Sequence, residues 1–179
     1  MNIPNQPWMS QEEIELISSF LNKEDAMLEY GCGGSTMFFP KFVGKYYSIE
    51  SDEVWANSVK KNMPKNVEIY TVPTTRPEDD KQKSITKWDQ LYNTKMYFAY
   101  KKYIETASLI NEKITKVLID GRARPQCARY IFDFLDKDAV IFFHDWHPSR
   151  PHYKTILEKY EIIETINRGQ MLAVLKKNE

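Results

Sequence analysis

The chain has 179 residues, of which 42% are hydrophobic, and its 25 basic and 25 acidic residues balance. This length fits one domain with a buried core, and the balanced charge gives no electrostatic case for nucleic acid or an anionic membrane as a partner. No stretch approaches the roughly 20 apolar residues of a membrane span, and the opening residues do not resemble a signal peptide, so we expect a single cytosolic domain over residues 1–179. Two cysteines, Cys32 and Cys127, are too few for a disulfide framework and are expected to be reduced packing residues.

A helix is predicted ahead of the first strand, within an N-terminal cap over residues 1–25. Ser10 and Glu13 form a capping box, and Ile14 and Ile17 follow at helical spacing. We expect this helix to cover an edge of the binding cleft. Trp8, just upstream, either lies over a bound ligand or anchors the segment in apolar surroundings, and the usual behaviour of aromatic side chains favours the anchor.

The next segment is a short apolar run that ends in a glycine-rich turn. A strand is predicted over residues 27–30 with a carboxylate at Glu29, and three glycines and two hydroxyl residues follow: Gly31, Gly33, Gly34, Ser35 and Thr36. Glycine has no Cβ, so backbone N–H groups of the turn can approach a ligand closely, and Ser35-Thr36 can cap the following helix. The dinucleotide fingerprint fails because Thr36 stands where its third glycine would be. Since Glu29 would also repel a diphosphate, the turn favours a ligand with an amine and no phosphate.

The sequence E-Y-G-C-G-G-S-T over residues 29–36 resembles the first motif of class I S-adenosylmethionine-dependent methyltransferases. The resemblance implies a doubly wound, Rossmann-like α/β sheet that is mostly parallel with an antiparallel final strand and has helices on both faces. It also implies S-adenosylmethionine as the cofactor, with Glu29 and the backbone from Gly31 to Gly34 holding its methionine part and with Ser35 and Thr36 among the cofactor-binding residues. After a helix over residues 37–43, a second strand over residues 45–50 ends in Glu50, about 20 residues after Glu29, which is the spacing of a ribose-binding acid. Glu50 and the adjacent Ser51 are therefore the predicted ribose ligands.

The middle of the chain contains the least globular segment. Residues 67–72 alternate in hydrophobicity as a third strand would. Residues 74–88 are polar and mixed in charge, so we expect a mobile loop that is either a substrate-recognising lid or a solvated insertion. An aromatic-rich helix then reaches about residue 111, where one or two tyrosines can face the acceptor.

A second motif lies where the fourth predicted strand, residues 116–119, ends. Residues 120–128, D-G-R-A-R-P-Q-C-A, are similar to the D-G-R-x-R-x-x-C-A block of a methyltransferase subset whose first motif is L-E-Y-G-x-G-G-S-T. A helix over residues 124–135 and a fifth strand over residues 139–143 lead to the H-D and R-P-x-Y matches of this subset, at residues 144–145 and 150–153. A helix to about residue 160 and strands over residues 162–166 and 171–175 would complete the fold. By resemblance, Asp120 and Gly121 lie near the transferred methyl group.

The ends of the predicted strands carry the candidate catalytic residues. In a doubly wound sheet the cleft lies beyond the carboxyl ends of the strands, so the polar residues at these ends should converge there: Glu29, Glu50, Asp120, His144 and Asp145. For a hydroxyl acceptor, His144 is the predicted base, because the ordinary histidine pKa of about 6.5 suits proton removal near neutral pH. Asp145 or Asp120 would orient the ring. A histidine that only stabilises the strand end is the alternative.

These residues favour O-methylation of a small molecule or a glycan sugar, with no nucleic-acid acceptor expected. Arg122 and Arg124 either bind this acceptor or pair with nearby acids. A metal-assisted, catechol-type O-methyltransferase would place Asp120, His144 and Asp145 around Mg²⁺, but a nitrogen ligand suits this hard cation poorly, so metal dependence is not favoured. A non-catalytic cofactor-binding domain is a further alternative, although the intact acids and glycine turn count against it. The sequence specifies neither the acceptor nor the oligomeric state.

Overall fold

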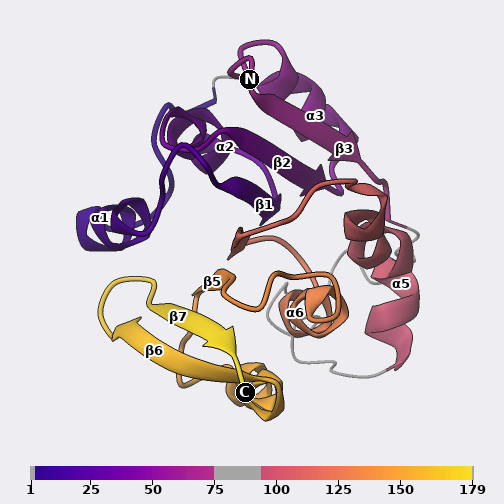
Figure 1. Cartoon of the computed structure of the whole chain (residues 1–179). Coiled ribbons are helices and arrows are strands. Elements are labelled where there is room, and N and C mark those ends of the chain that lie inside the picture. Colours follow the sequence, from indigo (N-terminus) through magenta and orange to yellow (C-terminus); the bar gives the residue numbers. More distant parts are fainter. Residues whose placement is uncertain (1–2, 75–93, 179) are drawn as a thin grey trace.

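The computed structural model describes residues 3–74 and 94–178, and its central feature is one β-sheet (Figure 1). Within these residues seven strands are arranged in the order β3-β2-β1-β4-β5-β7-β6. Neighbouring strands from β3 to β5 are parallel, whereas β7 is antiparallel to both β5 and β6. The strands are β1 (Ala26–Tyr30), β2 (Lys45–Glu50), β3 (Val67–Thr71), β4 (Lys116–Ile119), β5 (Val140–His144), β6 (Tyr160–Ile166) and β7 (Leu172–Lys177).

Helices cover both faces of the sheet, so the two faces carry separate apolar cores. Along β1, Met27 packs in one core with Ile17 of α1, and Leu28 packs in the other with residues of α5 and α6. In Figure 1, α1 lies on the opposite side of the sheet from α6. The described helices are α1 (Gln11–Ser19), α2 (Gly34–Phe38), η1 (Phe39–Lys41), α3 (Glu53–Lys60), α5 (Thr94–Glu105), η3 (Thr106–Leu109), α6 (Arg124–Ile131) and η4 (Pro151–Glu158), where η marks a 3₁₀ helix. The predicted doubly wound α/β fold is thus confirmed.

The register of the parallel strands brings their carboxyl ends to one level. Tyr30 at the end of β1 pairs with Ile49 of β2 and with Ile119 of β4, and Ile119 pairs with Phe143 of β5. The residues that follow these four positions therefore meet at the same edge of the sheet. This is the edge at which the sequence predicted a binding cleft.

The helix expected to reach about residue 160 is present as a 3₁₀ helix over residues 151–158. Two local predictions were wrong. The helix after the glycine turn begins at Gly34, not at residue 37, so its N-cap residue is Gly33, and Ser35 and Thr36 lie inside its first turn. Trp8 is no buried anchor, because 87% of its surface is exposed.

The N-terminal capping box is confirmed. Ser10 Oγ accepts a hydrogen bond from the Glu13 N–H, and Glu13 Oε2 accepts one from the Ser10 N–H at 2.7 Å. Of the predicted loop over residues 74–88, all but Thr74 lies outside the described residues. None of the described helices has both the length and the apolar character needed to cross a membrane.

Candidate functional site

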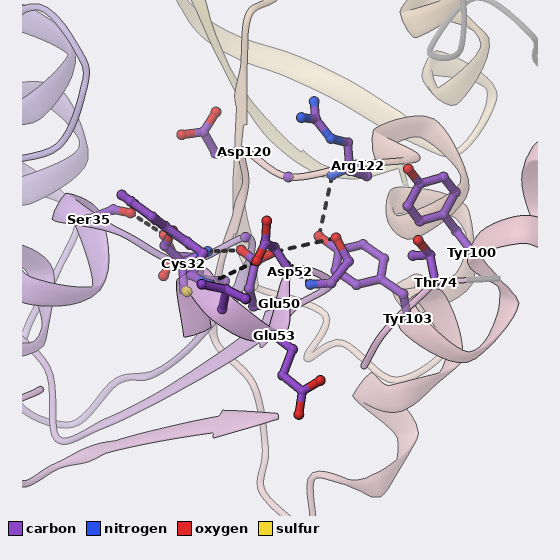
Figure 2. Close-up of a pocket in the computed structure, with 16 residues that line it drawn as sticks. Cys32, Ser35, Glu50, Asp52, Glu53, Thr74, Tyr100, Tyr103, Asp120 and Arg122 are labelled. Carbon is purple, nitrogen blue, oxygen red and sulfur yellow. Dashed lines mark hydrogen bonds between the residues drawn. The ribbon is translucent and has the colours of Figure 1, made fainter. Parts of the chain in front are cut away.

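A cavity of about 620 Å³ opens at the carboxyl ends of β1, β2 and β4 (Figure 2). Eight of the predicted site residues line it: Glu29, Gly31, Ser35, Glu50, Ser51, Asp120, Gly121 and Arg122. Six others do not line it: Gly33, Gly34, Thr36, Arg124, His144 and Asp145. The site therefore has an inner wall and a set of supporting groups behind it.

Two glycines of the turn are required for different reasons. Gly31 has a φ of 103°, in the left-handed region that side chains rarely adopt, and its N–H donates to the Ile49 carbonyl at 2.8 Å. Gly34 is needed for another reason, because a Cβ there would lie 1.9 Å from the carbonyl oxygen of Gln6. Gly34 thus makes room for the N-terminal segment, and its predicted approach to a ligand stays a prediction.

Glu29 lies beneath the turn and is almost completely buried. Its two carboxylate oxygens accept hydrogen bonds from the hydroxyls of Ser35 and Thr36, the latter at 2.6 Å. Burial raises the pKa of Glu29 to about 7, against the lowering effect of these two hydrogen bonds. Because both oxygens are already acceptors, Glu29 in this structure ties β1 to the start of α2, and its contact with a ligand ammonium group stays a prediction.

The raised pKa of Glu29 makes a testable link between pH and stability. In the unfolded chain this carboxyl titrates near 4.5, and in the folded chain near 7. The stability contributed by the neutral form is therefore fully present below pH 4.5 and is lost as the pH rises to about 7, on the order of 3 kcal/mol. Glu29→Gln should lose less stability than the wild type between pH 5 and pH 8, measured by urea unfolding. The exposed Glu161→Gln should keep the wild-type pH dependence, and equal dependence in all three proteins would contradict the assignment.

Glu50 connects the glycine turn after β1 to the turn between β2 and α3. Its Oε2 accepts from the N–H of Cys32 in the glycine turn at 2.9 Å, and its Oε1 accepts from the N–H groups of Ser51 and Asp52 at 2.6 and 2.8 Å. These donors hold the carboxylate in a fixed position before α3 begins. Burial raises the pKa of the neighbouring Cys32 thiol, and Glu50 and Glu29 raise it further, so a thiolate nucleophile is disfavoured at this position.

Asp120 and Arg122 form the wall that belongs to β4. The Asp120 side chain is 26% exposed, and its Oδ1 lies 2.7 Å from His144 Nδ1 and 3.2 Å from Arg124 Nη2. Burial would raise the pKa of Asp120, but His144, Arg124 and Arg122 outweigh it and hold this pKa below its ordinary value. Asp120 is thus a carboxylate anion at neutral pH, with one oxygen fixed from behind.

His144 lies behind Asp120 and not at the cavity wall. Its side chain is only 3% exposed, its Nδ1 contacts Asp120, and its Nε2 faces Glu13 Oε1 of α1 at 3.8 Å. The sequence placed His144 at the cavity, oriented by Asp120 or Asp145. In the structure Asp120 reaches the cavity and His144 lies behind it, because both ring nitrogens point at carboxylates. A direct contact between His144 and an acceptor would require the ring to turn away from both partners.

Arg124 is the buried cation that connects the ends of β4 and β5. Its Nη2 lies 3.2 Å from Asp120 Oδ1 and 2.9 Å from Asp145 Oδ2, and its Nη1 donates to the His144 carbonyl at 2.6 Å. Asp145 adopts a left-handed φ of 59° at this point. Of the two roles predicted for Arg124, pairing with nearby acids is the one that this geometry supports. Arg122, by contrast, lines the cavity and has no ion pair within the described residues.

The donor atoms of Asp120, His144 and Asp145 lie within 4.8 Å of one another, as a metal site would require. Arg124 Nη2, however, bridges the two carboxylates of this group. A divalent cation bound by the same oxygens would have to displace the guanidinium. The geometry therefore fits a metal poorly while Arg124 is in place.

Sequence reasoning missed several residues of the cavity wall. They are Cys32, Asp52, Glu53, Val54, Trp55 and Thr74. Tyr100 and Tyr103 also line the cavity, in agreement with the expectation that one or two tyrosines of their helix reach the site. The spacing of Tyr100 and Tyr103, three residues apart on α5, placed them on one helix face, but nothing in the sequence selected this face. Trp55 could have been found from its place in the first turn of the helix after Glu50; its Nε1 donates to the Cys32 carbonyl at 2.6 Å.

Comparisons with known proteins identify the fold. No protein-family model matches the chain, and no curated protein sequence matches it. Its structure is similar to a methyltransferase-like protein from Silicibacter pomeroyi DSS-3, with 22% identity, a TM-score of 0.70, and coverage of 99% of this chain and 91% of that chain. It is also similar to the tRNA (m1A58) methyltransferase TrmI of Aquifex aeolicus, with 14% identity, a TM-score of 0.62, and coverage of 94% and 68%. A Streptococcus mutans protein described as a methyltransferase and solved with SAH has 13% identity, a TM-score of 0.57, and coverage of 95% and 100%. The chain therefore has the Rossmann-like methyltransferase fold.

Proposed function

We propose that this protein transfers a methyl group from S-adenosylmethionine to an acceptor hydroxyl. The observation that carries the proposal is the cavity with Glu50 on one wall and Asp120 on the other. It lies where β1 and β4 are neighbours and the strand order reverses, which is where doubly wound sheets bind nucleotide ligands. The similar structure that was solved with SAH supports the same class of ligand.

In the proposed complex, Glu50 and Ser51 hold the ribose, and the backbone after Gly31 approaches the methionine part. Gly33, Gly34 and Thr36 act behind this wall: Thr36 Oγ1 accepts from the Gly33 N–H at 2.9 Å and fixes the turn. Gly121 and Asp120 lie on the side of the cavity next to β4, and we assign them to the region of the transferred methyl group. This arrangement places the cofactor across the ends of β1, β2 and β4.

The proposed chemical step needs alignment more than reactive side chains. The acceptor oxygen attacks the methyl carbon opposite sulfur; the O–C bond forms as the C–S bond breaks, and the electron pair of that bond stays on sulfur as a neutral thioether. The hydroxyl proton leaves to a base. An oxygen that gains a methyl group becomes strongly acidic, so a carboxylate of low pKa is a sufficient base, and we assign this contact to Asp120. His144, Arg124 and Asp145 then position Asp120 from behind.

A small molecule or a glycan sugar is the acceptor class that we favour. Among the described residues, five acidic side chains line the cavity, at Glu29, Glu50, Asp52, Glu53 and Asp120, and one basic side chain does, at Arg122. This lining favours a cationic cofactor and disfavours a polyanionic acceptor such as nucleic acid. Arg122 is the group that we assign to acceptor recognition. A metal-assisted mechanism is the second candidate, favoured only by the Asp120, His144 and Asp145 cluster and opposed by the position of Arg124.

Calorimetry with the purified protein tests the proposal. S-adenosylmethionine and S-adenosylhomocysteine should both bind, and NAD should bind more weakly than either. No binding of either sulfur nucleoside by well-folded protein, or tighter binding of NAD, would refute the proposed cofactor.

A non-catalytic cofactor-binding domain would pass this binding test, so a second experiment is needed. Glycans and small metabolites from cells with and without the protein would be compared by mass spectrometry. A compound that loses the mass of one methyl group in the absence of the protein supports an enzyme and identifies the acceptor. Tight cofactor binding with no such difference would favour the binding domain.

A further inference from the structure

Glu13 of α1 reaches the supporting side of the candidate site. Its side chain is fully buried, and its Oε2 accepts the capping-box hydrogen bond from Ser10 N–H. Its Oε1 lies 3.8 Å from His144 Nε2. Within the described residues neither of these two buried atoms has a hydrogen-bond partner. The sequence explained Glu13 by the capping box alone, which uses only one of its two oxygens.

The two unpartnered atoms face each other in a place that water does not reach. A buried carboxylate oxygen and an unprotonated imidazole nitrogen are both acceptors, so without a proton they would repel each other and both would remain unsatisfied. At 3.8 Å the gap holds no water molecule, and a small side-chain shift closes it to hydrogen-bond length. A proton between the two atoms satisfies both of them, whichever atom carries it.

We propose that Glu13 and His144 share a buried proton, and that this pair is a positioning device for the Asp120 carboxylate. With Nε2 satisfied by Glu13, the ring keeps its Nδ1–H directed at Asp120 Oδ1, 2.7 Å away. Arg124 Nη2 also contacts Oδ1, so Oδ2 is left for a ligand in the cavity. A chain of contacts thereby runs from the Ser10 N–H through Glu13, His144 and Asp120 to the cavity wall. Glu13 is a positioning residue, and its effect on ligand binding rests on the proposed function.

Proton NMR of the ligand-free protein tests the shared proton directly. Two slowly exchanging, strongly downfield signals are expected from the His144 ring. One comes from the proton between Nδ1 and Asp120, and the other from the proton between Nε2 and Glu13; both should disappear in His144→Gln. In Glu13→Gln the amide keeps an acceptor for Ser10 N–H and offers its own N–H to Nε2, so the second signal should be lost and the first retained. Glu15→Gln, a neutralising change on the exposed face of the same helix, should keep both signals. One signal or none in the wild type, or two unchanged signals in Glu13→Gln, would overturn the proposal.

A second measurement tests the positioning role. Glu13→Met offers Nε2 no partner, so Asp120 loses its fixed donor and the dissociation constant for S-adenosylmethionine should rise about tenfold. Ser10→Ala removes the other half of the capping box but leaves Glu13 facing His144, and its affinity should stay within about twofold of wild type. Equal losses in both variants would reduce Glu13 to a helix cap. If the NMR signals are present but no sulfur nucleoside binds the wild type, the proposed function fails and the shared proton stands.

Discussion

Glu50→Ala is expected to weaken the binding of S-adenosylmethionine by about 10- to 100-fold, or about 1.5–3 kcal/mol. The reason is that its carboxylate is held by three backbone N–H groups at the cavity wall, where it can accept hydrogen bonds from both ribose hydroxyls. Isothermal titration calorimetry measures the effect. Glu53→Ala is the matched control, because Glu53 lines the same cavity one turn along but is exposed, and it should change the affinity by less than about twofold.

A thermodynamic cycle of one protein change and one ligand change distinguishes the loss of a ribose contact from a disturbance of the turns that Glu50 holds. S-adenosylhomocysteine and an analogue without the two ribose hydroxyls would be titrated into the wild type and into Glu50→Ala. If Glu50 binds the ribose, the loss from the protein change and the loss from the ligand change should not add, because both remove the same contact. Additive losses would mean that Glu50 supports the turn and that another group holds the ribose.

The parts of the fold that sequence predicted well are those decided by neighbouring residues. The run from Met27 to Tyr30 followed by Gly31 predicted a buried strand and a sharp turn, and the structure has both, since burial on two faces and a positive φ are local requirements. The strand ends also predicted which polar residues would gather at one edge of the sheet. This prediction succeeded because the carboxyl ends of parallel strands lie at the same edge of the sheet.

What sequence did not predict are contacts between distant segments. The need for glycine at position 34 comes from Gln6, and the position of the His144 ring comes from Glu13, which lies in another part of the chain. Periodicity can place a side chain on a helix face or at a strand end, but it contains no information on which of two polar neighbours lies nearer the cavity. For this reason His144 was expected at the wall, where the structure has Asp120.

Arg124→Met is expected to lower the free energy of unfolding by about 3–5 kcal/mol, the largest change in stability that we predict. Removing the guanidinium leaves Asp120 and Asp145 close together and partly buried without their shared cation, and leaves the His144 carbonyl without its donor. Urea unfolding measures the difference. Arg122→Met removes a cation two residues away that has no ion pair within the described residues, and it should change stability by less than about 1 kcal/mol. Similar losses in the two variants would argue that the Arg124 network contributes little.

The same variant tests whether Arg124 takes the place of a metal ion. Without the guanidinium, Arg124 no longer bridges Asp120 and Asp145, and a cation that replaces the Nδ1 proton of His144 can bind between the three donor atoms; Zn²⁺ suits this mixed nitrogen and oxygen set. Added Zn²⁺ should therefore stabilise Arg124→Met, because a ligand that binds only the folded state raises the free energy of unfolding. Neither Zn²⁺ nor a chelator should change the stability of the wild type, in which the guanidinium already bridges both carboxylates. Equal stabilisation of the two proteins by Zn²⁺ would place the metal elsewhere, and stabilisation of the wild type alone would make Arg124 part of the metal site and not its replacement.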